Sequence, residues 1–144
     1  MPYIRHMMAS PALRIIVADD NADQVLTLAA LLEDAGHVVR TFKTGAGLLE
    51  AIEQFQADVC ILDIEMPMHS GYAIAGQLKS RYGSVRPFLV AISGKWYRAA
   101  DQLLAKSCGF DEFLEKPADA RQLMFILAGV RQRLAPASAA ASRP

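Results

Sequence analysis

Acidic, hydroxyl and ammonium side chains stand at the ends of strand-length apolar runs in this chain, at Asp19, Asp20, Asp63, Ser93 and Lys116. Three carboxylates close together repel one another strongly unless a cation lies among them. Hard oxygen ligands that leave room for water favour Mg²⁺, with Mn²⁺ as the alternative. The Lys116 ammonium and the Ser93 hydroxyl can hold an anion beside such a metal. The combination predicts a site that accepts a phosphoryl group, with Asp63 as the nucleophile.

The elements that must bring these side chains together alternate between strand and helix patterns. Strand-length apolar runs predict strands at 13–18, 37–42, 59–63, 87–92 and 110–114. Apolar residues at helical spacing predict helices at 21–35, 44–55, 71–82, 97–107 and 119–134. Strict alternation implies a parallel sheet with right-handed crossovers and helices on both faces. The carboxyl ends of parallel strands meet at one edge, which is where open α/β sheets bind their ligands.

Composition limits the remaining classes of function. The chain has 144 residues, enough for one domain with a sizeable core, and 53% of them are hydrophobic. Its 15 basic and 15 acidic residues cancel, which gives no reason to expect nucleic acid or an anionic membrane as a partner. No apolar run approaches the roughly 20 residues that span a bilayer, and the first residues lack the apolar core of a signal peptide. A cytoplasmic protein is therefore expected.

The two ends of the chain and the two cysteines give no sign of a functional site. Residues 1–11 are expected to be a leader, 12–134 the folded domain, and 135–144 a disordered tail rich in small residues and proline. Cys60 and Cys108 show no metal-ligand spacing and are expected to be buried, reduced thiols.

Four short motifs resemble those of the receiver domain of bacterial two-component response regulators. They are D-D-N after the first strand, D-I-E-M-P with Gly71 after the third, I-S-G after the fourth, and E-K-P after the fifth. Each motif alone is weak, but all four occur in order, and the resemblance covers about residues 12 to 134. It implies a flavodoxin-like, doubly wound α/β fold, in which a five-stranded parallel sheet of order 2-1-3-4-5 and five helices form three layers. It also implies a phosphorylated signalling switch rather than an enzyme.

The resemblance gives roles to the residues at the carboxyl edge. Asp63 would be the phosphoacceptor and would be phosphorylated by a histidine kinase or a histidine phosphotransfer protein. Mg²⁺ would be held by Asp19, Asp20 and Asp63, with the backbone carbonyl of Glu65 completing the set. Lys116 would bridge to the phosphoryl group.

The resemblance also assigns a switch. Ser93, where the family more often has threonine, would move toward the phosphoryl group, and Phe113 stands at the position of the family's aromatic switch residue. Pro117 would follow a cis peptide bond. The surface of 97–107, 110–114 and 119–134 would then change, to control an output partner that the sequence does not name or to form a homodimer.

Two features suggest how this chain departs from its relatives. Glu65 and Lys95 stand two residues after Asp63 and Ser93, at positions that line the approach of the hydrolytic water in this family. We hypothesise that they pair and slow the loss of the phosphoryl group. Trp96 and Tyr97 are a candidate partner surface, although half-buried packing is an equally good interpretation.

Three other functions compete with this one. A flavodoxin-like enzyme would need a loop rich in glycine, serine or threonine after the first strand, where this chain has D-D-N-A-D. A phosphohydrolase with an aspartyl nucleophile resembles D-x-D-x-T, which D-I-E-M-P fits poorly. A degenerate receiver that serves only as an interaction module would not need the complete set of site residues.

Overall fold

The computed structural model describes residues 12–66, 69–94 and 99–134. Within them, one sheet contains the strands β1 (Arg14–Ala18), β2 (Val38–Phe42), β3 (Val59–Asp63), β4 (Phe88–Ser93) and β5 (Glu112–Glu115). The helices are α1 (Ala22–Asp34), α2 (Leu48–Phe55), α3 (Gly71–Tyr82), α4 (Ala99–Cys108) and α5 (Ala120–Arg133), with a 3₁₀ turn, η2 (Gly83–Val85).

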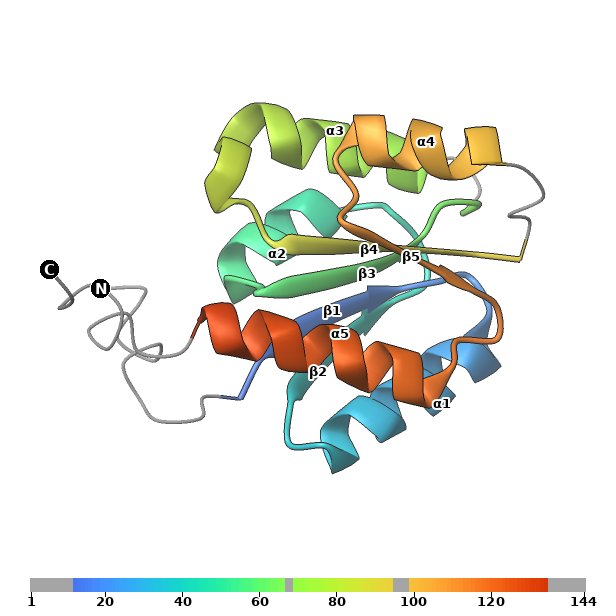
Figure 1. Ribbon diagram of the computed structural model, residues 1–144, viewed down its shortest axis with the longest axis vertical. Helices are drawn as coiled ribbons and strands as arrows, with labels where there is room; N and C mark the ends of the chain where they lie inside the picture. Colours follow the sequence, from blue (N-terminus) through green and yellow to red (C-terminus); the bar gives the residue numbers. More distant parts are fainter. Residues whose placement is uncertain (1–11, 67–68, 95–98, 135–144) are drawn as a thin grey trace, which may run out of the picture.

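All neighbouring strands are parallel, and their order is β2-β1-β3-β4-β5. Figure 1 shows the three layers, with α1 and α5 against one face of the sheet and α2, α3 and α4 against the other. The predicted fold class and strand order are therefore confirmed.

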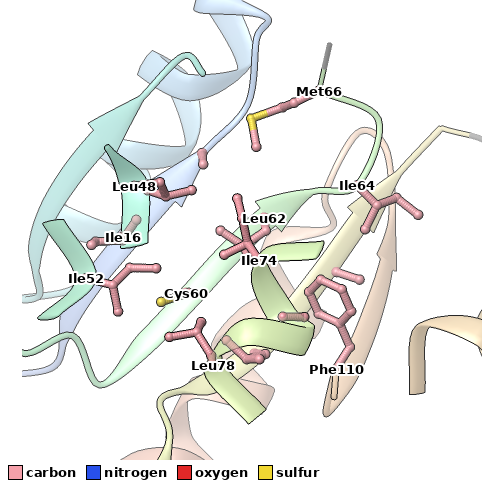
Figure 2. Close-up of a cluster of buried hydrophobic side chains, with 14 of the residues drawn as sticks. Ile16, Leu48, Ile52, Cys60, Leu62, Ile64, Met66, Ile74, Leu78 and Phe110 are labelled. Carbon is pink, nitrogen blue, oxygen red and sulfur yellow. The ribbon is translucent and has the colours of Figure 1, made fainter. Parts of the chain in front are cut away.

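The central strand β3 is buried along its whole length because helices cover both faces of the sheet. Its residues alternate between two apolar clusters. Cys60 and Leu62 pack with α2 and α3, as Figure 2 shows, whereas Val59 and Ile61 pack with α1 and α5. This burial holds Asp63, the last residue of the strand, at a fixed place on the sheet edge.

Two predicted starts of elements are wrong, one by four residues and one by two. The helix expected from Thr44 begins at Leu48, because the Thr44 hydroxyl accepts the Ala46 N–H and Gly47 adopts a left-handed φ of 70°. The strand expected from Phe110 begins at Glu112, because the Phe110 N–H bonds to the carbonyl of Ala105 and so belongs to the end of α4. The helix expected from residue 97 is described from Ala99 onward.

The two thiols differ in burial. Cys60 is buried, and desolvation raises its pKa, so this thiol is held in its protonated form. Cys108 is only half-buried, which corrects the prediction that both are buried. Among the described residues, no helix is both long and apolar enough to cross a bilayer.

Candidate functional site

The candidate site lies at the carboxyl edge of the sheet, where the strand order reverses direction. The chain passes from β1 outward to β2 and later returns to the other side of β1 as β3. Strand register then places Ala18 beside Leu62, and Ser93 beside Glu115. Since every strand points the same way, the residues that follow β1, β3, β4 and β5 gather around one crevice.

Three carboxylates meet at this crevice. Oxygen atoms of Asp19, Asp20 and Asp63 all lie within 4.8 Å of one another. Asp63 is 1% and Asp19 3% exposed, whereas Asp20 faces solvent. Backbone N–H groups orient the buried pair, since Asn21 donates to Asp19 Oδ1 and Glu65 donates to Asp63 Oδ1, both at 2.9 Å. The second oxygen of each carboxylate contacts Lys116, and Asp19 Oδ1 also lies 3.3 Å from the Lys116 ammonium.

Lys116 places an ammonium between the two buried carboxylates. Its Nζ lies 2.9 Å from Asp63 Oδ2 and 3.2 Å from Asp19 Oδ2. Burial by itself lowers the pKa of Lys116, but the hydrogen bonds and charges of Asp63 and Asp19 outweigh that effect and raise it. Lys116 is therefore a fixed positive charge beside the candidate phosphoacceptor.

The carboxylates outnumber the cations at this edge. Burial raises the pKa of Asp19, and the nearby charge of Asp63 raises it further, although the Asn21 N–H and Lys116 act in the opposite direction. Three oxygen ligands with one open, solvent-facing member suit a hard divalent cation that keeps part of its water. The residues present therefore fit Mg²⁺, as the sequence predicted.

Ser93 and Phe113 lie on neighbouring strands, β4 and β5. Ser93 is 1% exposed at the end of β4, and its carbonyl accepts the Lys116 N–H at 2.9 Å. Phe113 is half-buried on β5 and packs against the cluster on the α3 and α4 side. The Lys116–Pro117 peptide bond is cis, as predicted. These residues connect the crevice to β5 and to the layer that contains α4.

The start of α3 requires Gly71 for steric reasons that sequence reasoning did not identify. A Cβ at Gly71 would lie 2.9 Å from Ile64 Cα and 3.1 Å from the Asp63 carbonyl oxygen. The Ser70 hydroxyl caps α3 by accepting the Tyr72 N–H. The Ser-Gly pair at the predicted helix start was the available signal, but only the fold shows that the helix abuts the backbone of Asp63.

Not every predicted residue can be placed. The side chain of Glu65 is exposed beside the crevice. Lys95, Trp96 and Tyr97 lie outside the described residues, so the pairing and the partner surface predicted for them stay predictions.

A cavity of about 410 Å³ lies elsewhere, where Phe88, Arg133 and Glu53 are among its lining residues. It lies beside the amino ends of β3, β4 and β5, at the opposite edge of the sheet from the crevice. Its charged groups are engaged within the fold, since Arg133 stacks on Phe88 and Glu53 pairs with Arg81. It takes no part in the candidate site.

The fold and the crevice define a doubly wound α/β domain with an acidic site at the switch point of the sheet. The chain matches the response regulator receiver domain family over residues 15–128, and it belongs to that family.

The curated relatives include long sensor proteins, of which the chain matches a small part, and a protein that the chain matches over most of its length. The chain is 31% identical to the sensory/regulatory protein RpfC of Xanthomonas campestris pv. campestris, over 95% of this chain and 20% of that protein. It is 31% identical to the aerobic respiration control sensor protein ArcB of Escherichia coli K12, over 76% of this chain and 14% of that protein. It is also 30% identical to protein PilH of Pseudomonas aeruginosa, over 77% of this chain and 91% of PilH. The chain thus spans a fifth or less of the two sensor proteins.

Solved structures share the fold. The chemotaxis response regulator CheY4 of Vibrio cholerae superposes with a TM-score of 0.74 at 21% identity, over 83% of this chain and 98% of that one. A response regulator receiver domain protein from Clostridium thermocellum gives a TM-score of 0.75 at 26% identity, over 84% of this chain and 95% of that one.

Proposed function

We propose that Asp63 accepts a phosphoryl group from a phosphohistidine donor and that the resulting acyl phosphate switches the domain. The observation that carries this proposal is the position of Asp63, which ends a fully buried strand with Lys116 Nζ 2.9 Å from its Oδ2. A carboxylate held in this way beside a fixed ammonium and two further carboxylates matches the requirements of phosphoryl transfer. In the transfer, the donor's N–P bond breaks as a bond forms between phosphorus and an Asp63 oxygen.

The other residues of the crevice would support that step. Asp19, Asp20 and Asp63 would hold Mg²⁺, with the Glu65 carbonyl as a further ligand, and a bound Mg²⁺ would neutralise charge on the transferred oxygens. Lys116 would exchange its contact with Asp63 Oδ2 for one with a phosphoryl oxygen. The Ser93 hydroxyl would donate to another, and Phe113 would follow it inward.

The surface that changes on phosphorylation and contacts the output partner would be formed by α4, β5 and α5. Leu103 and Leu104 on α4 are 69% and 52% exposed, and Phe125 on α5 is 81% exposed. Exposed apolar side chains of this size suit contact with a partner or with a second copy. The donor would be a histidine kinase or a histidine phosphotransfer protein in the cytoplasm, in keeping with the sensor proteins among the relatives.

Acetyl phosphate with Mg²⁺, followed by intact mass measurement, tests the central claim. The wild-type protein is expected to gain the mass of one phosphoryl group, and Asp63→Asn is expected to gain none because its amide is not a nucleophile. Asp34→Asn, which removes an exposed carboxylate at the end of α1, is the matched control and should label like wild type. Absence of an adduct on wild type, together with failure to bind beryllofluoride, would favour the degenerate interaction module.

The lifetime of the phosphoryl group gives a second test. If Lys95 pairs with Glu65 across the path of the attacking water, Lys95→Ala should shorten the phosphoryl half-life. The half-life is followed by intact mass after the phosphodonor is removed. An unchanged half-life in Lys95→Ala would show that the proposed pair of Glu65 and Lys95 does not set the lifetime of the phosphoryl group.

A further inference from the structure

Helix α4 is weakly buried along its length. Ala105 is its one fully buried side chain, whereas α3 buries Ile74, Ala75 and Leu78. Leu103 and Leu104 are more than half exposed on the same helix. Because apolar burial is what holds most helices in place, α4 depends on other contacts for its position.

Those contacts gather at the carboxyl end of the helix. The Phe110 N–H bonds to the Ala105 carbonyl and the Gly109 N–H bonds to the Lys106 carbonyl, which is the hydrogen-bond pattern of a Schellman motif. Gly109 has a φ of 119°, a value that favours glycine. A Cβ there would also lie 3.3 Å from the Ala75 carbonyl oxygen, so α3 closely abuts this turn.

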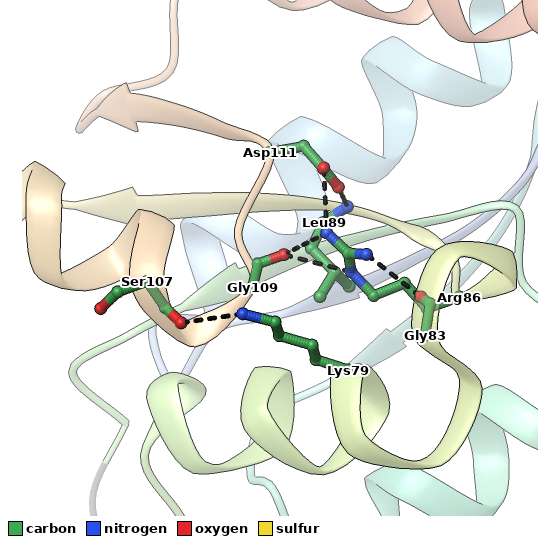
Figure 3. Close-up of polar contacts among 7 residues, drawn as sticks. All are labelled: Lys79, Gly83, Arg86, Leu89, Ser107, Gly109 and Asp111. Carbon is green, nitrogen blue, oxygen red and sulfur yellow. Dashed lines mark hydrogen bonds and ion pairs between the residues drawn. The ribbon is translucent and has the colours of Figure 1, made fainter.

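The side chain of Arg86 clamps the same turn to the start of β4. Its Nε and Nη2 donate to the Gly109 carbonyl at 3.2 and 2.9 Å, as Figure 3 shows. The guanidinium is itself held, since Nη1 donates to the Gly83 carbonyl at 3.1 Å and Nη2 lies 3.1 Å from Asp111 Oδ1. Asp111 Oδ2 in turn accepts the Leu89 N–H of β4 at 2.8 Å. A planar guanidinium is suited to such a fork, because its donors are fixed in direction.

Two further contacts join this turn to α3. Lys79 Nζ donates to the Ser107 carbonyl at 3.3 Å, which Figure 3 also shows. The rings of Tyr72 and Phe110 pack edge to face, with centroids 6.4 Å apart. The last turn of α4 is thus attached to α3 and to β4, whereas the exposed Leu103 and Leu104 lie in the middle of the helix.

We infer that α4 moves as a lever about its carboxyl end, and that Arg86 holds the pivot at Gly109. This inference rests on the proposed function, because phosphorylation of Asp63 would supply the trigger through Ser93 at the end of β4. With the pivot fixed, the displacement is largest at the amino end of α4 and carries Leu103 and Leu104 with it. Arg86 is therefore a positioning residue that decides where α4 bends away from the domain.

Amide NMR of the full chain, before and after labelling with acetyl phosphate and Mg²⁺, tests the inference. In wild type, labelling should shift the amide signals of Ala99–Leu104 and leave those of Ser107–Phe110 nearly unchanged. In Arg86→Met the shifts should extend into Ser107–Phe110. Hydrogen exchange of those amides should accelerate at least about tenfold even without labelling, as expected when charge-assisted hydrogen bonds are lost from a locally opening segment. The extent of labelling by intact mass should equal that of wild type.

Arg81→Met is the matched control, because Arg81 is a nearby exposed arginine on α3 whose guanidinium pairs with Glu53 of α2. It should give the wild-type pattern. If Arg86→Met does not fold, Arg86→Lys keeps the charge without the fork and should accelerate exchange at the same amides. Equal shifts throughout α4 in wild type, or wild-type exchange at Ser107–Phe110 in a folded Arg86 variant, would overturn the pivot. Failure of wild type to gain a phosphoryl group would instead overturn the proposed function, and with it the trigger.

Discussion

Lys116→Met is expected to reduce the rate of Asp63 phosphorylation by acetyl phosphate by about 10²–10³-fold, the usual cost of removing one preorganised charge donor from a transition state. The ammonium of Lys116 contacts both buried carboxylates. The backbone of Lys116 is itself fixed, because its N–H donates to the Ser93 carbonyl at the end of β4. Methionine preserves the length and much of the apolar stem but offers no donor. The rate is measured by intact mass against time at saturating Mg²⁺.

The same variant should also change the resting protein. Without the ammonium, Asp19 and Asp63 remain buried with no other cation paired to them in the described structure, so metal-free Lys116→Met should unfold at a lower temperature than wild type. Mg²⁺ should restore more stability to this variant than to wild type. Lys106→Met, on the exposed side of α4, is the control for loss of a lysine. A Lys116→Met protein that labels at the wild-type rate would contradict the role assigned to this residue.

Mg²⁺ is expected to raise the free energy of unfolding of the wild-type protein by about 2.7 kcal/mol at a concentration about 100-fold above its dissociation constant. The physical reason is that the metal relieves the repulsion among Asp19, Asp20 and Asp63, whose oxygens lie within 4.8 Å of one another. In a domain of about 150 residues each kcal/mol shifts the unfolding midpoint by about 2–4 °C. Thermal unfolding followed by circular dichroism, with and without Mg²⁺, measures the shift.

Asp20→Asn should lose most of that shift, and its metal-free midpoint should lie at or slightly above that of wild type, because the change removes one of the three repelling charges and the Asp20 side chain is exposed. Asp23→Asn removes an exposed carboxylate from the first turn of α1 and should keep the full Mg²⁺ effect. If Asp20→Asn were stabilised by Mg²⁺ as much as wild type is, the metal would have to bind elsewhere.

Local pattern was sufficient to find most of the elements. The apolar run ending at Asp63 and the helix at about Gly71–Tyr82 were predicted close to their observed bounds, because their apolar spacing and their flanking polar residues agree. The boundaries near Gly47 and Gly109 could not, because in both places a left-handed glycine turns the chain while the hydrophobic pattern continues. The spacing of hydrophobic residues carries no information on the backbone angle φ. Such turns are therefore found only in the three-dimensional structure.

The sequence by itself determined which chemical groups stand at the strand ends, and therefore the class of chemistry and the family. Only the tertiary structure decided how they meet, because Lys116 is separated by 53 residues from Asp63 and by 97 from Asp19. Their contact depends on the order of the strands and on the twist of the sheet, which no local pattern encodes. The same holds for the approach of Gly71 to Asp63 and of Arg86 to Gly109, where packed backbones set the distance.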